Sequence, residues 1–187
     1  MRLRRVQISL LAALMVLPTT VLRVEAAPGV YLSSGEFLGS IFQDTMGEAS
    51  SLVVNSEKRT EIEQILGHKF PRLRLRYWQQ ENTTAWILDE VGKTEPITIG
   101  VAIEAGKVKS VRILEFRESR GWEIRFPFFT DQFEDTALGS RLALDKPIDG
   151  ITGATLSVIA VDKIVRVALL LDGHLRSARE ADFFASN

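Results

Sequence analysis

The sequence predicts an α+β domain in which helices pack on an antiparallel sheet that is built as a meander. From residue 72 to residue 116, apolar and polar residues alternate in short runs separated by turn residues, as in neighbouring antiparallel strands. Runs with helical spacing precede these strands, and a longer apolar helix is predicted from residue 155. The 187 residues suffice for one ordinary domain, or for one domain with a small N-terminal extension.

The N-terminus has the layout of a signal peptide. Residues 1–5 are basic, and residues 6–17 are almost entirely apolar. The apolar stretch stops at Pro18, which is short of the roughly 18 to 20 residues that a comfortable transmembrane helix needs. We expect cleavage after Ala26 and a periplasmic protein. A retained anchor in the inner membrane, formed by residues 1–26, is the first alternative, and an apolar helix packed on the domain is a weaker one.

Composition excludes several classes of function. Removing residues 1–26 would leave 19 basic and 23 acidic side chains, and this mild acidity argues against general binding to nucleic acid. The chain has no cysteine, which excludes disulfides, thiolate catalysis, iron–sulfur clusters and cysteine-ligated zinc. His68 and His174 each follow a glycine and stand alone, so we expect helix ends there and no metal site.

Before the alternating strands, the sequence predicts two helices. The first is short and runs from Ser34 to about Met46. The second has Asn55 or Ser56 as its cap and Gly67 as its stop. A strand follows Pro71, with buried Leu73, Leu75 and Tyr77. Its outward arginines could bind a phosphate or an acidic partner, although solvated arginines are the more common case. Residues 27–82 are thus interpreted as a helical extension with a first strand.

The middle of the chain predicts three further strands, Thr83–Leu88, Pro96–Glu104 and Val108–Phe116, and a tight turn joins the last two. The following irregular segment, residues 118–133, is rich in aromatic residues and is expected to cover one edge of the sheet. Such a segment can be a binding surface, but aromatic runs in small domains are most often core.

A buried helix is predicted from about Thr155, with Asp172 and Gly173 as its end. Residues 83–175 would then form the main domain, and residues 176–187 a polar tail. At the start of this helix, unpaired backbone N–H groups and the macrodipole favour an anion such as phosphate. Gly153 and Ala154 leave the Thr155 hydroxyl accessible. From the spacing alone, a threonine that merely caps the helix is the more common case.

The segment Asp149-Gly-Ile-Thr-Gly-Ala-Thr155 resembles the flavinylation signature Asp-x-x-Ser/Thr-Gly-Ala-Thr/Ser. This signature marks the FMN-binding domains of the sodium-pumping NADH:quinone reductase, of Rnf-type complexes and of small exported flavoproteins. The resemblance implies that FMN is joined to Thr155 by a phosphodiester, and that a periplasmic, metal-dependent flavin transferase takes the FMN from FAD. It places Asp149, Thr152, Gly153 and Ala154 in the recognised motif.

A second match lies upstream, where Glu118-Ser-Arg-Gly121 resembles the Glu-Thr/Ser-x-Gly segment that follows the central hairpin in this family. Phe129-Thr-Asp-Gln-Phe133 resembles the aromatic Gln-Phe segment after it, so the similarity spans roughly residues 84 to 171. Arg120 departs from the pattern, since this position is often proline in the pump subunits. We expect Glu118, Trp122 and Phe129 near the flavin ring, with a purely structural role as the alternative for each.

These observations predict an exported electron carrier that relays electrons between a membrane redox protein and a periplasmic acceptor. An extracytoplasmic flavin reductase acting on a small acceptor is the second hypothesis. The third is a binding or assembly module without flavin, in which Thr155 only caps a helix.

Overall fold

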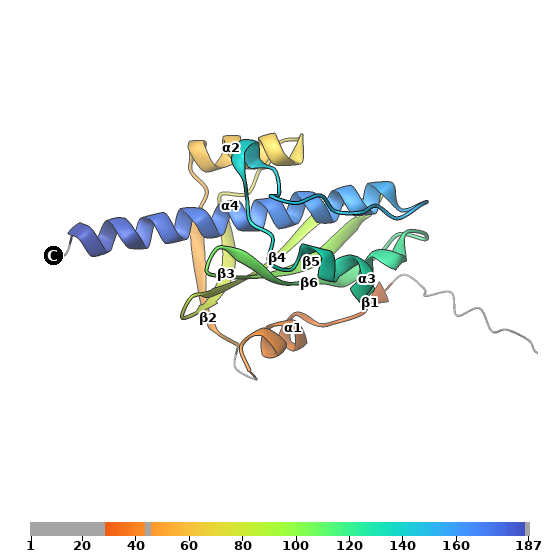
Figure 1. The fold of residues 1–187 in the computed structure, drawn as a ribbon, viewed down its shortest axis with the longest axis horizontal. Helices are drawn as coiled ribbons and strands as arrows, with labels where there is room; N and C mark the ends of the chain where they lie inside the picture. Colours follow the sequence, from red (N-terminus) through yellow and green to blue (C-terminus); the bar gives the residue numbers. More distant parts are fainter. Residues whose placement is uncertain (1–28, 44–45, 186–187) are drawn as a thin grey trace, which may run out of the picture.

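The computed structural model describes residues 29–43 and 46–185, which form a six-stranded antiparallel sheet with helices on both faces (Figure 1). The predicted signal peptide, residues 1–26, lies outside the described residues. The strand order is β1-β6-β5-β4-β3-β2, so the predicted α+β fold with an antiparallel meander is confirmed. The strands are β1 (Gly29–Val30), β2 (Glu48–Val53), β3 (Arg74–Gln80), β4 (Thr83–Val91), β5 (Pro96–Glu104) and β6 (Lys107–Phe116).

The strands of the meander, from β3 to β6, lie where the sequence predicts them. β5 has the predicted bounds, and β4 continues three residues beyond the predicted Leu88, to Val91. Leu73 is the exception: it precedes β3 and is 68% exposed, so the prediction that it is buried is wrong. Burial on this strand begins at Leu75, because Leu75 is the first apolar residue that faces the helices.

Two strands were not predicted, and both lie at the edges of the sheet. β2 pairs antiparallel with β3, and β1 pairs with the end of β6 through Gly29 and Phe116. Neither face of the edge strand β2 is deeply buried, so apolar residues are not required on alternate positions. Its sequence, Glu-Ala-Ser-Ser-Leu-Val, accordingly lacks the alternation that predicts a strand. Residues 27–82 and 83–175 therefore contribute strands to one continuous sheet.

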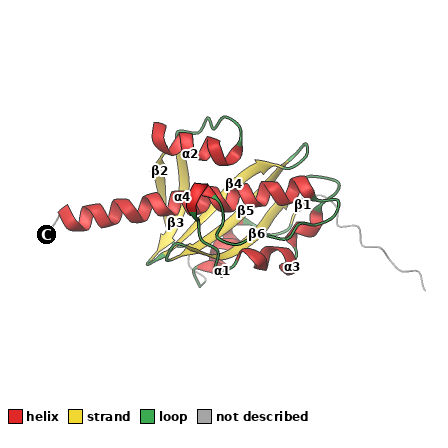
Figure 2. Ribbon diagram, turned by 45° about the horizontal axis from the view of Figure 1, so that its top comes forward, coloured by secondary structure: helices red, strands yellow, loops and turns green. Residues whose placement is uncertain are grey.

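Helices cover the two faces of the sheet unequally (Figures 1 and 2). The long helix α4 (Thr155–Ala185) crosses one face, and α2 (Ser56–Leu66) packs beside it to complete the larger apolar core. On the other face, α1 (Ser34–Ile41) places Phe37 and Leu38 against a small core cluster. The Phe37 ring lies so close to Gly100 that a Cβ there would be 2.8 Å from it. The shorter helical segments are η1 (Trp122–Arg125), α3 (Pro127–Thr130), η2 (Asp131–Phe133) and η3 (Ser140–Leu142).

Helix α4 is longer than predicted. The prediction that Asp172 and Gly173 end it is wrong, because the helix continues to Ala185. The Asp172 carboxylate is buried and accepts hydrogen bonds from the Thr84 hydroxyl at 2.8 Å and from Arg176 Nε at 2.9 Å. These bonds tie the turns on both sides of Gly173 and offset the roughly 1 kcal/mol that a glycine costs inside a helix. The last turns, from Arg176 onward, are exposed and extend past the sheet (Figure 1).

Both histidines contact glutamate side chains. His68 follows Gly67, the left-handed C-cap of α2, as predicted, and its Nε2 lies 3.0 Å from Glu90. His174 lies inside α4 and not at a helix end, and its Nε2 contacts Glu61 at 2.8 Å. Within residues 29–43 and 46–185 no cluster of three potential metal ligands occurs, and no helix is long and apolar enough to cross a membrane.

Candidate functional site

The first turn of α4 leaves the Thr155 hydroxyl free. The carbonyl of Ala154 accepts the first helical hydrogen bond, from the Val158 N–H at 2.9 Å, so Ala154 stands at the capping position and Thr155 at the first helical position. Alanine has no side-chain oxygen with which to cap. Thr155 is exposed, and its hydroxyl forms no hydrogen bond within the described part of the chain. The hydroxyl is therefore available for chemistry rather than engaged in capping.

The turn that precedes the helix explains two of the motif residues. The Ala154 N–H donates to the Ile151 carbonyl at 3.0 Å, which closes a tight turn around Thr152 and Gly153. Gly153 has a φ of 85°, a left-handed conformation that disfavours side chains, and a Cβ there would point into open space. The glycine thus shapes the turn and leaves the approach to Thr155 open.

A cavity of about 470 Å³ lies beside Thr155. Three separate segments line it: the turn between β4 and β5, the loop after β6, and the start of α4. The lining residues are Lys93, Glu118, Ser119, Arg120, Gly153, Ala154, Thr155, Leu156 and Ser157. The structure therefore brings together the two segments that carry the sequence resemblance, around Glu118 and around Thr155.

Glu118 holds the turn between β4 and β5 in place. Its Oε1 accepts hydrogen bonds from the backbone N–H groups of Lys93 and Thr94, both at 2.6 Å, and of Glu95 at 3.0 Å. Its Oε2 accepts a further bond from the Thr94 hydroxyl at 3.1 Å. Burial by itself would raise the pKa of Glu118, but these donors outweigh it and lower the pKa from its ordinary value of 4.5. The carboxylate is thus ionised, and it fixes the backbone that carries Lys93 at the cavity.

Gly121 lets the loop after β6 approach the first turn of α4. Its φ is 89°, and a Cβ there would lie 2.7 Å from Ser157 Oγ and 3.4 Å from Ala154 Cβ. No other residue satisfies both the left-handed backbone and this close contact without strain. The glycine of the Glu-Ser-Arg-Gly segment is therefore needed to close the cavity wall.

We expect Gly121→Ala to destabilise the fold by roughly 1–3 kcal/mol, because the new methyl group would be strained in its backbone and would collide with Ser157. Urea unfolding followed by tryptophan fluorescence measures this loss. Gly150→Ala is the matched control, since a Cβ at Gly150 would meet no atom within 4 Å. Equal stability of the two variants would contradict the close packing of this loop on α4.

The structure places the other predicted site residues around the cavity or away from it. Asp149 and Thr152 are exposed and do not line it; the Asp149 N–H donates to Gln132 Oε1 at 2.8 Å, which ties the motif to the aromatic segment. Trp122 is half-buried, packs edge-on against Phe126 at 5.4 Å and lies outside the lining. Phe129 is fully buried in the core.

Sequence reasoning did not select Lys93, Ser119 or Ser157, and Arg120 was noted only as a departure from the family pattern. Ser157 follows Thr155 in the same helical turn, so the helical start could have indicated it. Lys93 reaches the cavity only because Glu118, 25 residues later, holds its turn. No local pattern marks such a contact.

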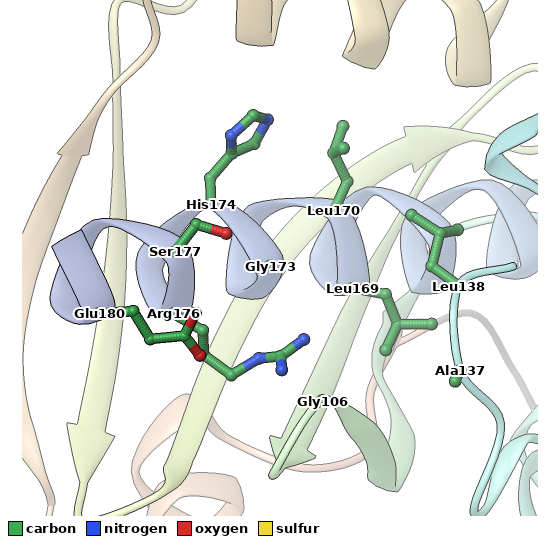
Figure 3. A pocket seen from close by; sticks show the side chains of 10 residues that line it. All are labelled: Gly106, Ala137, Leu138, Leu169, Leu170, Gly173, His174, Arg176, Ser177 and Glu180. Carbon is green, nitrogen blue, oxygen red and sulfur yellow. The ribbon is translucent and has the colours of Figure 1, made fainter. Parts of the chain in front are cut away.

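A second cavity, of about 430 Å³, lies along the C-terminal half of α4 (Figure 3). His174, Arg176 and Glu180 line it together with Leu169 and with Gly106 from the turn between β5 and β6. That turn is at the opposite end of the strands from the turn that carries Lys93. This cavity contains no residue of the segments Asp149–Thr155, Glu118–Gly121 or Phe129–Phe133, so we place the candidate site at Thr155.

Together these features define an α+β protein with a polar ligand cavity at the start of its longest helix, where exposed N–H groups and two basic side chains suit a phosphorylated ligand. Residues 92–170 match the family model of the FMN-binding domain, and this part of the chain belongs to that family. FMN is the cofactor that this membership indicates, and the cavity at Thr155 fits its anionic phosphate. No curated protein and no solved structure matches the chain.

Proposed function

We propose that this protein is an exported bacterial flavoprotein that carries FMN covalently on Thr155 and relays electrons between a membrane redox protein and a periplasmic acceptor. The observation that carries the proposal is the free, exposed Thr155 hydroxyl at the mouth of a polar cavity, inside a domain of the FMN-binding family. The N-terminal signal layout supports export, and a retained N-terminal segment would hold the protein at the inner membrane.

Covalent attachment requires a donor and a modifying enzyme. With FAD as donor, Thr155 Oγ would form a bond to the flavin-side phosphorus while the pyrophosphate bond breaks. AMP leaves, and the hydroxyl proton is released. The chain then gains one FMN less one water. A flavin transferase is therefore the expected partner, and the open turn around Gly153 would give it access to the hydroxyl.

A covalent bond suits a flavoprotein outside the cytoplasm. Noncovalent occupancy depends on the ratio of free ligand to the dissociation constant, and free FMN is scarce there. A phosphodiester removes that dependence. When bound, FMN supplies the one- or two-electron chemistry, and the protein contributes binding, orientation and electrostatics. An open cavity such as the one at Thr155 favours electron exchange with a partner protein.

A flavin reductase is less well supported by the site. Glu118 is a carboxylate that lines the cavity, but its oxygens already accept four hydrogen bonds from residues 93–95. It is therefore poorly placed to exchange protons with a substrate. A module without flavin, in which Thr155 only caps α4, is disfavoured because Ala154 occupies the capping position.

Intact mass tests the proposal. The chain should be exported to the periplasm with a flavin transferase, and separately without it. We expect a mass gain of one FMN less one water, together with flavin absorbance, only when the transferase is present. An unmodified, colourless protein in both cases would refute the covalent site. Slow steady-state turnover of quinones and metal chelates by the loaded protein would support a carrier, whereas rapid turnover would indicate a reductase.

A further inference from the structure

A cluster of aromatic rings surrounds an arginine at the surface of the loop after β6. The guanidinium of Arg125 lies over the rings of Tyr31, Trp122 and Phe126, at 4.4, 5.2 and 5.0 Å from their centroids. Phe128 continues the cluster, since its ring centroid is 6.2 Å from that of Phe126. We call these five residues the aromatic–arginine surface.

This surface exposes large apolar rings around a cation that has no anionic partner. Phe128 is 61% exposed and Phe126 is 36% exposed. The Arg125 side chain forms no ion pair and no hydrogen bond within residues 29–43 and 46–185, and its Nε is buried without an acceptor. Grouped apolar side chains at a surface mark an interaction site more often than scattered ones do. The partner should therefore offer both an apolar phase and anionic groups.

The chain enters the described structure at this surface. Tyr31 directly follows β1, which pairs with the end of β6 through Gly29 and Phe116. The strand β1, helix α3 and the start of α4 lie at the same end of the molecule, and the C-terminus of α4 lies at the other (Figures 1 and 2). Because α4 has 31 residues, it is about 46 Å long. The N-terminal segment is thus joined to the end that carries the aromatic–arginine surface.

The interface of a lipid bilayer has the chemistry that this surface lacks. Tryptophan and tyrosine rings are favoured at the level of the lipid headgroups, and arginine binds phosphate groups there. The apolar stretch of residues 6–17 is short for a membrane-spanning helix. Stable attachment by a weak anchor generally requires a second contact with the membrane. The aromatic–arginine surface is placed to provide that contact.

We propose that the aromatic–arginine surface rests on the headgroup region of the inner membrane, with Phe126 and Phe128 inserted and Arg125 bound to lipid phosphate groups. This inference rests on the membrane partnership in the proposed function, and it favours a retained N-terminal anchor over cleavage after Ala26. It does not depend on covalent flavin attachment. The same loop lines the cavity beside Thr155, so the contact would hold a bound flavin close to the membrane redox protein.

Spin labelling tests this contact directly. The chain has no cysteine, so Phe128→Cys provides a unique thiol for a nitroxide label. The full chain is reconstituted into vesicles of phosphatidylethanolamine and phosphatidylglycerol, and paramagnetic resonance measures collisions of the label with oxygen and with a water-soluble nickel chelate. We expect the label at position 128 to meet the chelate at least about threefold less often than a label on a control site, because a polar chelate is excluded from an apolar phase. Collisions with oxygen should increase.

Phe184→Cys is the matched control, because Phe184 is 78% exposed in the last turn of α4, at the opposite end of the molecule. Adding Arg125→Gln to Phe128→Cys should raise the chelate collisions toward the control value. Arg179→Gln removes an exposed arginine from the last turns of α4 and should leave them unchanged. Circular dichroism and urea unfolding confirm that each variant folds.

Three results would overturn the membrane contact. One is a label at position 128 that meets the chelate as often as the label at position 184. Another is a label shielded from both reagents, since protein would then cover the surface. The third is loss of residues 1–26 from the protein recovered from its host, as shown by intact mass. The flavin site is judged separately: a chain that gains no mass with the transferase would refute the linkage and leave the membrane contact standing.

Discussion

Replacing Thr155 by valine is expected to abolish covalent flavin attachment completely, since valine has nearly the same shape as threonine but no oxygen that could bond to phosphorus. Thr155 is exposed at the first position of α4 and its hydroxyl supports no other group of the described chain, so the free energy of unfolding should change by less than about 0.5 kcal/mol. Intact mass after export with a flavin transferase measures the loss, and urea unfolding measures the stability.

Two companion variants make this result specific. Thr155→Ser keeps a hydroxyl at the same place and should retain the mass gain, although its extent could differ. Thr60→Val removes another helical threonine hydroxyl, one that donates to the Ser56 carbonyl and does not line the cavity, and should leave attachment unchanged. A full mass gain in Thr155→Val would place the linkage on a different residue and would refute the assignment.

Removing the carboxylate of Glu118 should have the largest effect on stability among the residues of the site. Glu118→Ala would leave the N–H groups of residues 93–95 without their acceptor, and we expect a loss of roughly 2–4 kcal/mol in the free energy of unfolding. The turn that carries Lys93 would lose its support as well. Glu95→Ala is the control, because that side chain is exposed on the same turn and should cost less than about 0.5 kcal/mol.

The pH dependence of stability tests the same contacts. The folded pKa of Glu118 lies below its ordinary value of 4.5, so its ionised form stabilises the fold above that pH. The contribution is lost as pH falls from 4.5 through the folded pKa. The stability difference between the wild type and Glu118→Gln should therefore shrink on acidification through this range, as measured by urea unfolding. A difference that stays constant would show that the hydrogen bonds do not favour the carboxylate form.

Local patterns were sufficient to predict much of the fold. The alternation in β5 and β6, the Asn55 cap and Gly67 stop of α2, and the start of α4 at Thr155 all depend on neighbours in sequence. The edge strand β2 was not predicted, because its own sequence has little apolar alternation. It forms by pairing with β3. The end of α4 was predicted wrongly, because the sequence near Gly173 does not show what continues the helix. Part of that stabilisation is a hydrogen bond to Asp172 from Thr84, which is distant in sequence.

The sequence by itself determined the antiparallel α+β architecture and singled out Thr155 with its glycine turn, since periodicity, capping and a contiguous motif are properties of short segments. Only the tertiary structure decided that Lys93, Arg120 and Ser157 share one cavity, and that Glu118 supports a turn rather than facing the cavity as a free carboxylate. The physical reason is that hydrogen bonds and charge act over a few ångströms in space, whatever the separation along the chain, and the packing of α4 on the sheet sets those distances.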